Sequence, residues 1–197
     1  MVAEAANGRR PRADFARNRA GILDSAERQF SAEGVNASLE TVARGAGVGS
    51  ATLYRHFPTR EALLAELLER RIVQIESERS RIDRMDDTGE ALAAWLVALE
   101  DFFAAFDGLP GPLRDAMLEE HNPLTTTCTG FIDSTDTFLA AAQRDGKARE
   151  SLRGRDLFLA ALTLSWIRGA SLADRDSQRQ LRALISDGWV PHGVPGS

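Results

Sequence analysis

The sequence predicts an all-α protein of about nine helices, divided into a small three-helix unit at the amino terminus and a larger helical unit after it. Three observations support this fold class. Apolar residues recur three and four positions apart along most of the chain, as they do on one face of a helix. Glycine and proline interrupt this pattern at short intervals, and no segment shows the alternation of a half-buried strand.

The first helix is expected over residues 16–33, where apolar side chains fall at helical spacing and Gly34 marks the end. Before it, residues 1–13 are polar and carry three arginines around Pro11, so we expect a flexible basic arm. The three-helix unit is expected to span residues 14–62.

Residues 38–60, SLETVARGAGVGSATLYRHFPTR, divide into two short helices joined by a glycine turn. Ser38 stands at the N-cap position of the first helix, and Gly47 can adopt the left-handed conformation that reverses the chain. The second helix runs from about Gly49 to Phe57. This pattern is typical of a helix-turn-helix motif, whose second helix enters the major groove of DNA, and a generic helical hairpin is the alternative.

The outward side of the second short helix carries small or hydrogen-bonding residues. Small side chains let a helix backbone come near the base edges, so such a face can approach nucleic acid closely. The residues on it are Ser50, Ala51, Thr52, Tyr54, Arg55 and His56.

The charge distribution fits this assignment although the net charge is −5. Residues 1–60 carry nine arginines and six acidic residues, which leaves 15 basic and 23 acidic residues in the remainder. The amino-terminal part can therefore meet phosphate, while the rest keeps the protein off random DNA. The basic arm either lies along DNA or is a solvated tail.

The segment AGVGSATLYRHFPTREALL resembles the DNA-binding signature of the TetR family of bacterial transcriptional regulators, and the resemblance covers about residues 17–68. Arg60 stands where the family usually has a phosphate-contacting lysine. Gly49 departs from the commonest pattern, in which this position is often serine.

The resemblance also distributes roles over the second short helix. It implies that Ser50, Ala51 and Thr52 face bases, and that Tyr54 and His56 contact phosphate. The expected DNA-binding residues are Ser38, Ser50, Ala51, Thr52, Tyr54, Arg55, His56, Thr59 and Arg60.

After Pro58, Thr59 can cap a long helix that continues to about Arg81. In the TetR family this helix connects the DNA-binding part to the regulatory part. The resemblance therefore implies that its tilt sets the distance between the two DNA-binding parts of a dimer.

The regulatory domain is expected over residues 63–190, followed by a tail at 191–197. The glycines and prolines of residues 108–112 are expected to end one helix, and residues 121–129 to be irregular or a weak helix start. Its helices are expected over 90–106, 113–120, about 131–146, 155–170 and 175–189.

Large apolar residues in this domain form either a plain packed core or the wall of an internal pocket. The resemblance favours a pocket, because the second domain of the family typically holds a small molecule between its helices. We expect a small, largely apolar effector. The candidate ligand-binding residues are Trp95, Leu99, Phe102, Phe103, Met117, His121, Cys128, Phe131, Phe138 and Trp166.

The last two helices are expected to form a homodimer through a four-helix interface, with intramolecular packing as the competing interpretation. Two copies read two half-sites, so affinity and specificity rise together. The predicted function is a ligand-responsive repressor that binds an inverted-repeat operator in double-stranded DNA and is released by its effector.

Two rival functions remain open. A sensor or enzyme with a metal or hydrolytic site around His121 is one, and an architectural DNA-binding protein without a ligand is the other.

We expect no enzyme activity, no cofactor and no resident metal, because the three histidines lack paired metal-ligand spacing and Cys128 is alone. The chain has no run of eighteen apolar residues and no apolar secretory segment, so we expect no membrane partner and a cytoplasmic location.

Overall fold

The structure is a computed structural model that describes residues 9–119, 121–169 and 174–191. Nine helices and no strand occur in these ranges, which confirms the all-α class. The helices are α1 (Arg9–Glu33), α2 (Leu39–Gly45), α3 (Ser50–His56), α4 (Arg60–Ile82), α5 (Thr88–Phe103), α6 (Pro110–Ala116), α7 (Thr125–Arg144), α8 (Gly154–Gly169) and α9 (Arg175–Trp189).

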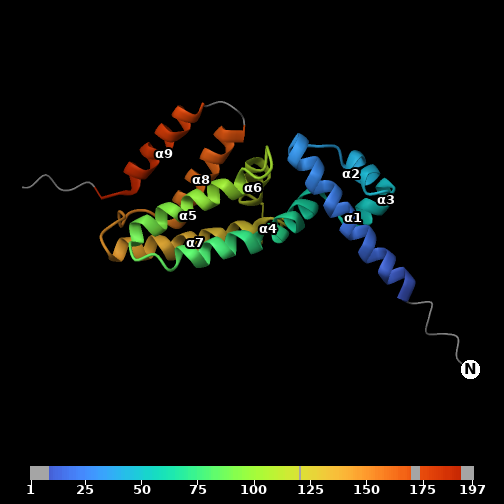
Figure 1. Cartoon of the computed structure of the whole chain (residues 1–197), viewed down its shortest axis with the longest axis horizontal. Coiled ribbons are helices and arrows are strands. Elements are labelled where there is room, and N and C mark those ends of the chain that lie inside the picture. Colours follow the sequence, from blue (N-terminus) through green and yellow to red (C-terminus); the bar gives the residue numbers. More distant parts are fainter. Residues whose placement is uncertain (1–8, 120, 170–173, 192–197) are drawn as a thin grey trace, which may run out of the picture.

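The helices form two groups joined by α4 (Figure 1). Helices α1, α2 and α3 gather at one end, and α4 leads away from them to the remaining helices. Within the second group, α5, α7 and α8 each pack on the other two, and α9 packs on α8. No helix in the described ranges is long and apolar enough to cross a membrane.

A continuous apolar core passes from one group to the other. Phe30 at the end of α1 meets Phe106, which follows α5, edge to face with ring centroids 6.3 Å apart. Nearby, the backbone N–H of Val35 donates a hydrogen bond to the carbonyl oxygen of Asp107 at 2.8 Å. The group of α1, α2 and α3 therefore rests on the turn between α5 and α6.

Several helix ends differ from the sequence expectation. Helix α1 begins at Arg9, so residues 9–13 of the expected arm are helical, while residues 1–8 and 192–197 lie outside the described residues. Helix α6 begins at Pro110 because proline fits the first turn of a helix, where its missing N–H would have no partner anyway. The prolines of this segment therefore start a helix as well as follow one.

Candidate nucleic-acid interface and effector cavity

The two short helices have the geometry of a helix-turn-helix. The Ser38 hydroxyl accepts a hydrogen bond from the backbone N–H of Glu40 at 3.2 Å, which confirms it as the cap of α2. Gly47 has a φ of +70°, the left-handed conformation expected of the turn. Leu53 and Phe57 are buried, so α3 is fixed by its inner side.

The position of α2 against α1 depends on one buried hydroxyl. Ser25 of α1 is fully buried, and its hydroxyl donates to the carbonyl oxygen of Val42 at 2.8 Å. Gly45 lies directly against this hydroxyl. Because glycine has no side chain, α1 and α2 can approach each other closely at this point. Sequence periodicity did not single out either residue.

The outer face of α3 is open. Ser50, Ala51, Tyr54 and Arg55 are exposed, and Thr52 is half-buried. The small residues lie in the first turn of the helix, where a recognition helix contacts base edges. Their assignment to bases, and that of Tyr54 to phosphate, stays a prediction.

His56 is held differently from its neighbours. Its ring packs on Phe15 of α1 at a centroid distance of 4.1 Å, and both ring nitrogens are buried without a partner among the described residues. Burial lowers the pKa of His56, and the charges of Arg55 and Arg19 lower it further. In this conformation His56 offers neither nitrogen to a phosphate, and Phe15 is a contact that the sequence analysis missed.

Arg60 is also engaged inside the protein. Its Nη1 donates to the carbonyl oxygens of Val35 at 2.5 Å and Ala37 at 2.8 Å, and its guanidinium lies 5.8 Å from the ring centroid of Phe30. These contacts hold the loop between α1 and α2. Thr59 caps α4, since its hydroxyl accepts from the N–H of Ala62 at 3.1 Å.

Most of the expected ligand-binding aromatic residues pack on one another in the regulatory domain. Trp95 is fully buried and donates through Nε1 to the Thr135 hydroxyl at 2.9 Å. Phe102 and Phe131 lie 4.9 Å apart, and Phe103 and Phe131 5.7 Å apart. The structure brings Trp95, Leu99, Phe102, Phe103, Phe131 and Phe138 together in the core.

The other candidates are dispersed. Met117 and Cys128 line a cavity of about 280 Å³ beside α6 and α7, whereas Trp166 is half exposed on α8. Burial raises the pKa of the Cys128 thiol to about 11. His121 is exposed and lines a polar cavity of about 630 Å³ between the two groups of helices, together with Arg60. Among the described residues, no three His, Cys, Asp or Glu side chains are grouped to hold a metal.

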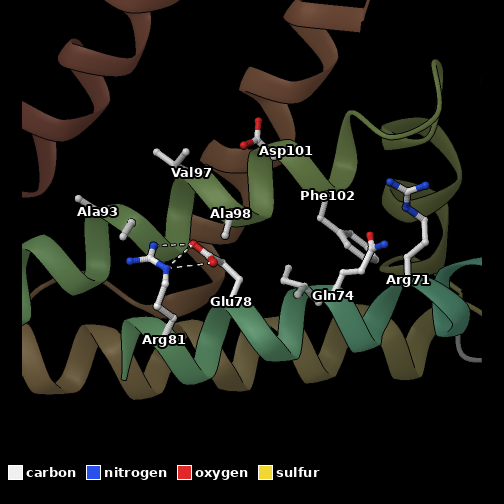
Figure 2. A pocket seen from close by; sticks show the side chains of 11 residues that line it. Arg71, Gln74, Glu78, Arg81, Ala93, Val97, Ala98, Asp101 and Phe102 are labelled. Carbon is white, nitrogen blue, oxygen red and sulfur yellow. Dashed lines mark hydrogen bonds and ion pairs between the residues drawn. The ribbon is translucent and has the colours of Figure 1, made fainter. Parts of the chain in front are cut away.

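An elongated cavity of about 510 Å³ lies between α4 and α5 (Figure 2). The α5 side is apolar and small, with Ala93, Ala94, Val97 and Ala98. Asp101 and Phe102 complete that side.

The polar part of the cavity comes from α4. Arg71 and Gln74 stand toward Phe102, and Glu78 and Arg81 stand toward the other end, joined by hydrogen bonds (Figure 2). Of the expected ligand-binding residues, Phe102 lines this cavity. The sequence analysis treated α4 as a connector and therefore missed its polar side as a binding surface.

The fold and the α3 face define a helix-turn-helix DNA-binding protein with a second, helical domain. The profile of the bacterial regulatory proteins of the tetR family matches residues 22–67, and that of the SbtR-like transcriptional regulator C-terminal domain matches residues 87–191. The chain belongs to the TetR family of bacterial transcriptional regulators. A comparison with curated proteins finds no match.

Solved structures of other proteins share this fold. The TetR regulator SCO0520 of Streptomyces coelicolor is 31% identical, with 89% of this chain and 99% of that chain covered and a TM-score of 0.56. FadR of Bacillus subtilis, in complex with stearoyl-CoA, is 20% identical over 86% and 98% of the chains, with a TM-score of 0.60. RolR, in complex with resorcinol, is 19% identical over 93% and 91%, with a TM-score of 0.59.

Proposed function

We propose that this protein is a ligand-responsive repressor that acts in the cytoplasm as a homodimer on an inverted-repeat operator, and that a small, largely apolar effector releases it. The observation that carries the proposal is the double use of α4. Leu63, Leu64 and Leu67 at its start are buried in the core behind the DNA-binding helices. Arg71 to Arg81, further along the same helix, line the cavity against α5. A ligand that moves α4 there also moves the recognition helix.

The proposed dimer forms through α8 and α9. Large apolar side chains stand exposed on these helices, with Trp166 51% and Leu184 68% exposed and Leu159 39% exposed. A two-fold interface would cover such surfaces, because the same patch meets itself on the second copy. It would also hold two α3 helices about 34 Å apart, or at another spacing set by the operator.

Release by the effector follows from linkage. Each good bidentate base contact contributes about 1–3 kcal/mol of discrimination, so misalignment of the two α3 helices by a shift of α4 removes several contacts together. The coupling is reciprocal, so bound operator must weaken effector binding by the same factor.

The test is a selection from random duplex DNA with the purified protein, followed by affinity measurements at two salt concentrations. We expect an enriched inverted repeat and a steep salt dependence, since phosphate contacts release counterions. Absence of enrichment at low salt contradicts the proposal. Sedimentation of the Leu184→Glu variant tests the dimer separately, with Val73→Glu on the exposed side of α4 as the matched control.

A further inference from the structure

We propose that the cavity between α4 and α5 binds an amphipathic organic acid whose single carboxylate pairs with Arg71 and displaces Glu27 of α1. The inference rests on the proposed function and adds the chemical class of the effector and the first contact that it breaks. It starts from the distribution of charge in the cavity.

Each carboxylate in the cavity lining already has an arginine. Arg81 donates from Nε to Glu78 at 3.1 Å, and Arg168 of α8 lies 2.7 Å from Asp101. Arg71 is different, because its partner Glu27 lies outside the lining and 3.7 Å away. Among the described residues the Arg71 side chain makes no hydrogen bond, so its guanidinium donors are the ones that a ligand can take.

The shape of the cavity selects an elongated ligand with one charged end. Arg71 and Arg81 are ten residues apart on α4, which corresponds to about 15 Å along the helix. Between them, Ala94 and Ala98 form a low apolar wall. A carboxylate at Arg71 would leave its hydrocarbon body along this wall, and the bidentate match of guanidinium and carboxylate favours an acid over an alcohol. Gln74 stands beside Arg71 as a second donor (Figure 2).

Arg71 also connects the cavity to the DNA-binding helices. Its guanidinium lies 5.4 Å from the ring centroid of Phe106, and Phe106 meets Phe30 of α1 edge to face. Phe30 in turn lies under Arg60, which holds the loop before α2. A ligand that draws Arg71 away from Glu27 therefore acts on a packed series of side chains that ends at the helix-turn-helix.

Three ion pairs join α1 to α4 among the described residues, and they provide a matched control. Arg19 pairs with Glu66, Arg70 with Asp24 at 2.8 Å, and Arg71 with Glu27. Of the three partners on α4, Glu66, Arg70 and Arg71, only Arg71 lines the cavity. Loss of the Arg70 pair should loosen α1 without altering the ligand site.

The experiment titrates decanoate and 1-decanol into the wild-type protein without DNA, by calorimetry. Decanoate should bind at least about tenfold more tightly than 1-decanol, because hydrogen bonds to charged groups are the stronger ones. Arg71→Gln should lose this preference, whereas Arg81→Gln and Arg70→Gln should keep it within about twofold. Glu27→Gln should bind decanoate more tightly, since Arg71 no longer has a competing partner.

Equal binding of decanoate and 1-decanol, equal losses in Arg71→Gln and Arg81→Gln, or no binding of either compound overturns the inference. Circular dichroism of each variant shows whether a loss reflects misfolding, and Glu27→Gln then decides by a gain that misfolding cannot produce. The operator selection is independent. An enriched repeat with no decanoate preference rejects the effector class alone, while a decanoate preference without an enriched repeat rejects the repressor and leaves the binding site.

Discussion

The DNA-binding helices α1–α3 and the regulatory helices α5–α9 are held together in different ways. In the first group, side chains bond to backbone groups at turns and helix ends, as Ser25, Ser38 and Arg60 do. In the second, contacts join side chains far apart in sequence, as in the hydrogen bond from Trp95 to Thr135. The first group is therefore held partly by side chains that satisfy backbone groups, and the second by side-chain contacts between whole helices.

The buried carboxylate of Glu100 shows the second kind of contact most clearly. Glu100 on α5 is 4% exposed, and Arg182 of α9 donates to both of its oxygens at 2.8 Å. Arg168 of α8 donates to the backbone carbonyl of Glu100 at 3.2 Å. A buried, hydrogen-bonded ion pair fixes geometry more than it adds stability, so Glu100 sets where α9 lies along α5.

The largest expected effect is on the regulatory core. Trp95→Ala should lower the free energy of unfolding by about 3–5 kcal/mol, because it removes a fully buried indole and leaves Thr135 without its donor. Chemical denaturation measures this loss. Val73→Ala, at an exposed position of α4, is the control and should change stability by less than about 0.5 kcal/mol. A stable Trp95→Ala protein that has lost ligand binding would instead make Trp95 part of a pocket wall.

A smaller effect is expected where α1 and α2 touch. Gly45→Ala places a methyl group against the Ser25 hydroxyl, which must then rotate away from the Val42 carbonyl. We expect a loss of about 1–3 kcal/mol in the free energy of unfolding, only partly offset by the better helix propensity of alanine. Gly49→Ala, which meets open space, is the matched control.

A double variant sharpens this prediction. Ser25→Ala in the Gly45→Ala background removes the overlap, so the pair should lose less stability than the sum of the single changes. Additive losses would show that the close approach of the two helices is not the cause.

The contrast between the two groups also explains what the sequence could predict. Ser38 and Thr59 as helix caps, and Gly47 as the turn, were predicted because the first two follow from a hydroxyl side chain and the third from the freedom of a glycine backbone. The same local reasoning was incomplete at Pro110, because the stretch of glycines and prolines was expected only to end a helix, whereas Pro110 also starts α6. It was wrong at Arg9, which lies in α1 although its surroundings look like a flexible arm.

The cavity between α4 and α5 could not be predicted in this way. It exists because α4 and α5, which carry Arg71 and Ala94, line a gap whose width depends on how α5 packs on α7 and α8. Helical periodicity indicates which residues share one face of a helix. It does not indicate whether that face packs tightly on a neighbouring helix or leaves a cavity against it. For the same reason, the aromatic residues expected around a pocket, such as Phe131 and Phe138, were correctly placed inside the domain without indicating a cavity.

A comparison of Arg60→Ala with Arg55→Ala distinguishes an arginine that stabilises the fold from one that contacts DNA. Arg60→Ala should lower the free energy of unfolding by about 1 kcal/mol, because the carbonyl groups of Val35 and Ala37 lose their donor. Arg55→Ala, at an exposed position of α3, should leave stability unchanged and reduce the slope of log affinity against log salt by about one. If Arg60→Ala reduces that slope equally, Arg60 contacts phosphate, as the family resemblance implies.

The smallest effect concerns pH and the ring of His56. The pKa of His56 in the folded protein is lowered from the ordinary value of 6.5. Below pH 6.5 the unfolded chain therefore binds a proton at His56 more readily than the folded protein does. The contribution of His56 to stability is therefore complete above about pH 6.5 and is lost as the pH falls toward its lowered pKa. Unfolding free energies measured from pH 7.5 to 5.5 should decline in the wild type and decline less in His56→Gln.

Glu66 and Asp87 do not contribute to this decline, because hydrogen bonds lower their pKa values from the ordinary carboxylate value, which already lies below this pH window. Phe15→Ala provides the matched change, since it uncovers the ring of His56 and should bring its pKa back toward 6.5. The pH dependence of Phe15→Ala should therefore flatten as that of His56→Gln does. A wild-type decline that survives in both variants would have to come from another group, and the contact of α1 with the end of α3 would then carry no pH dependence of its own.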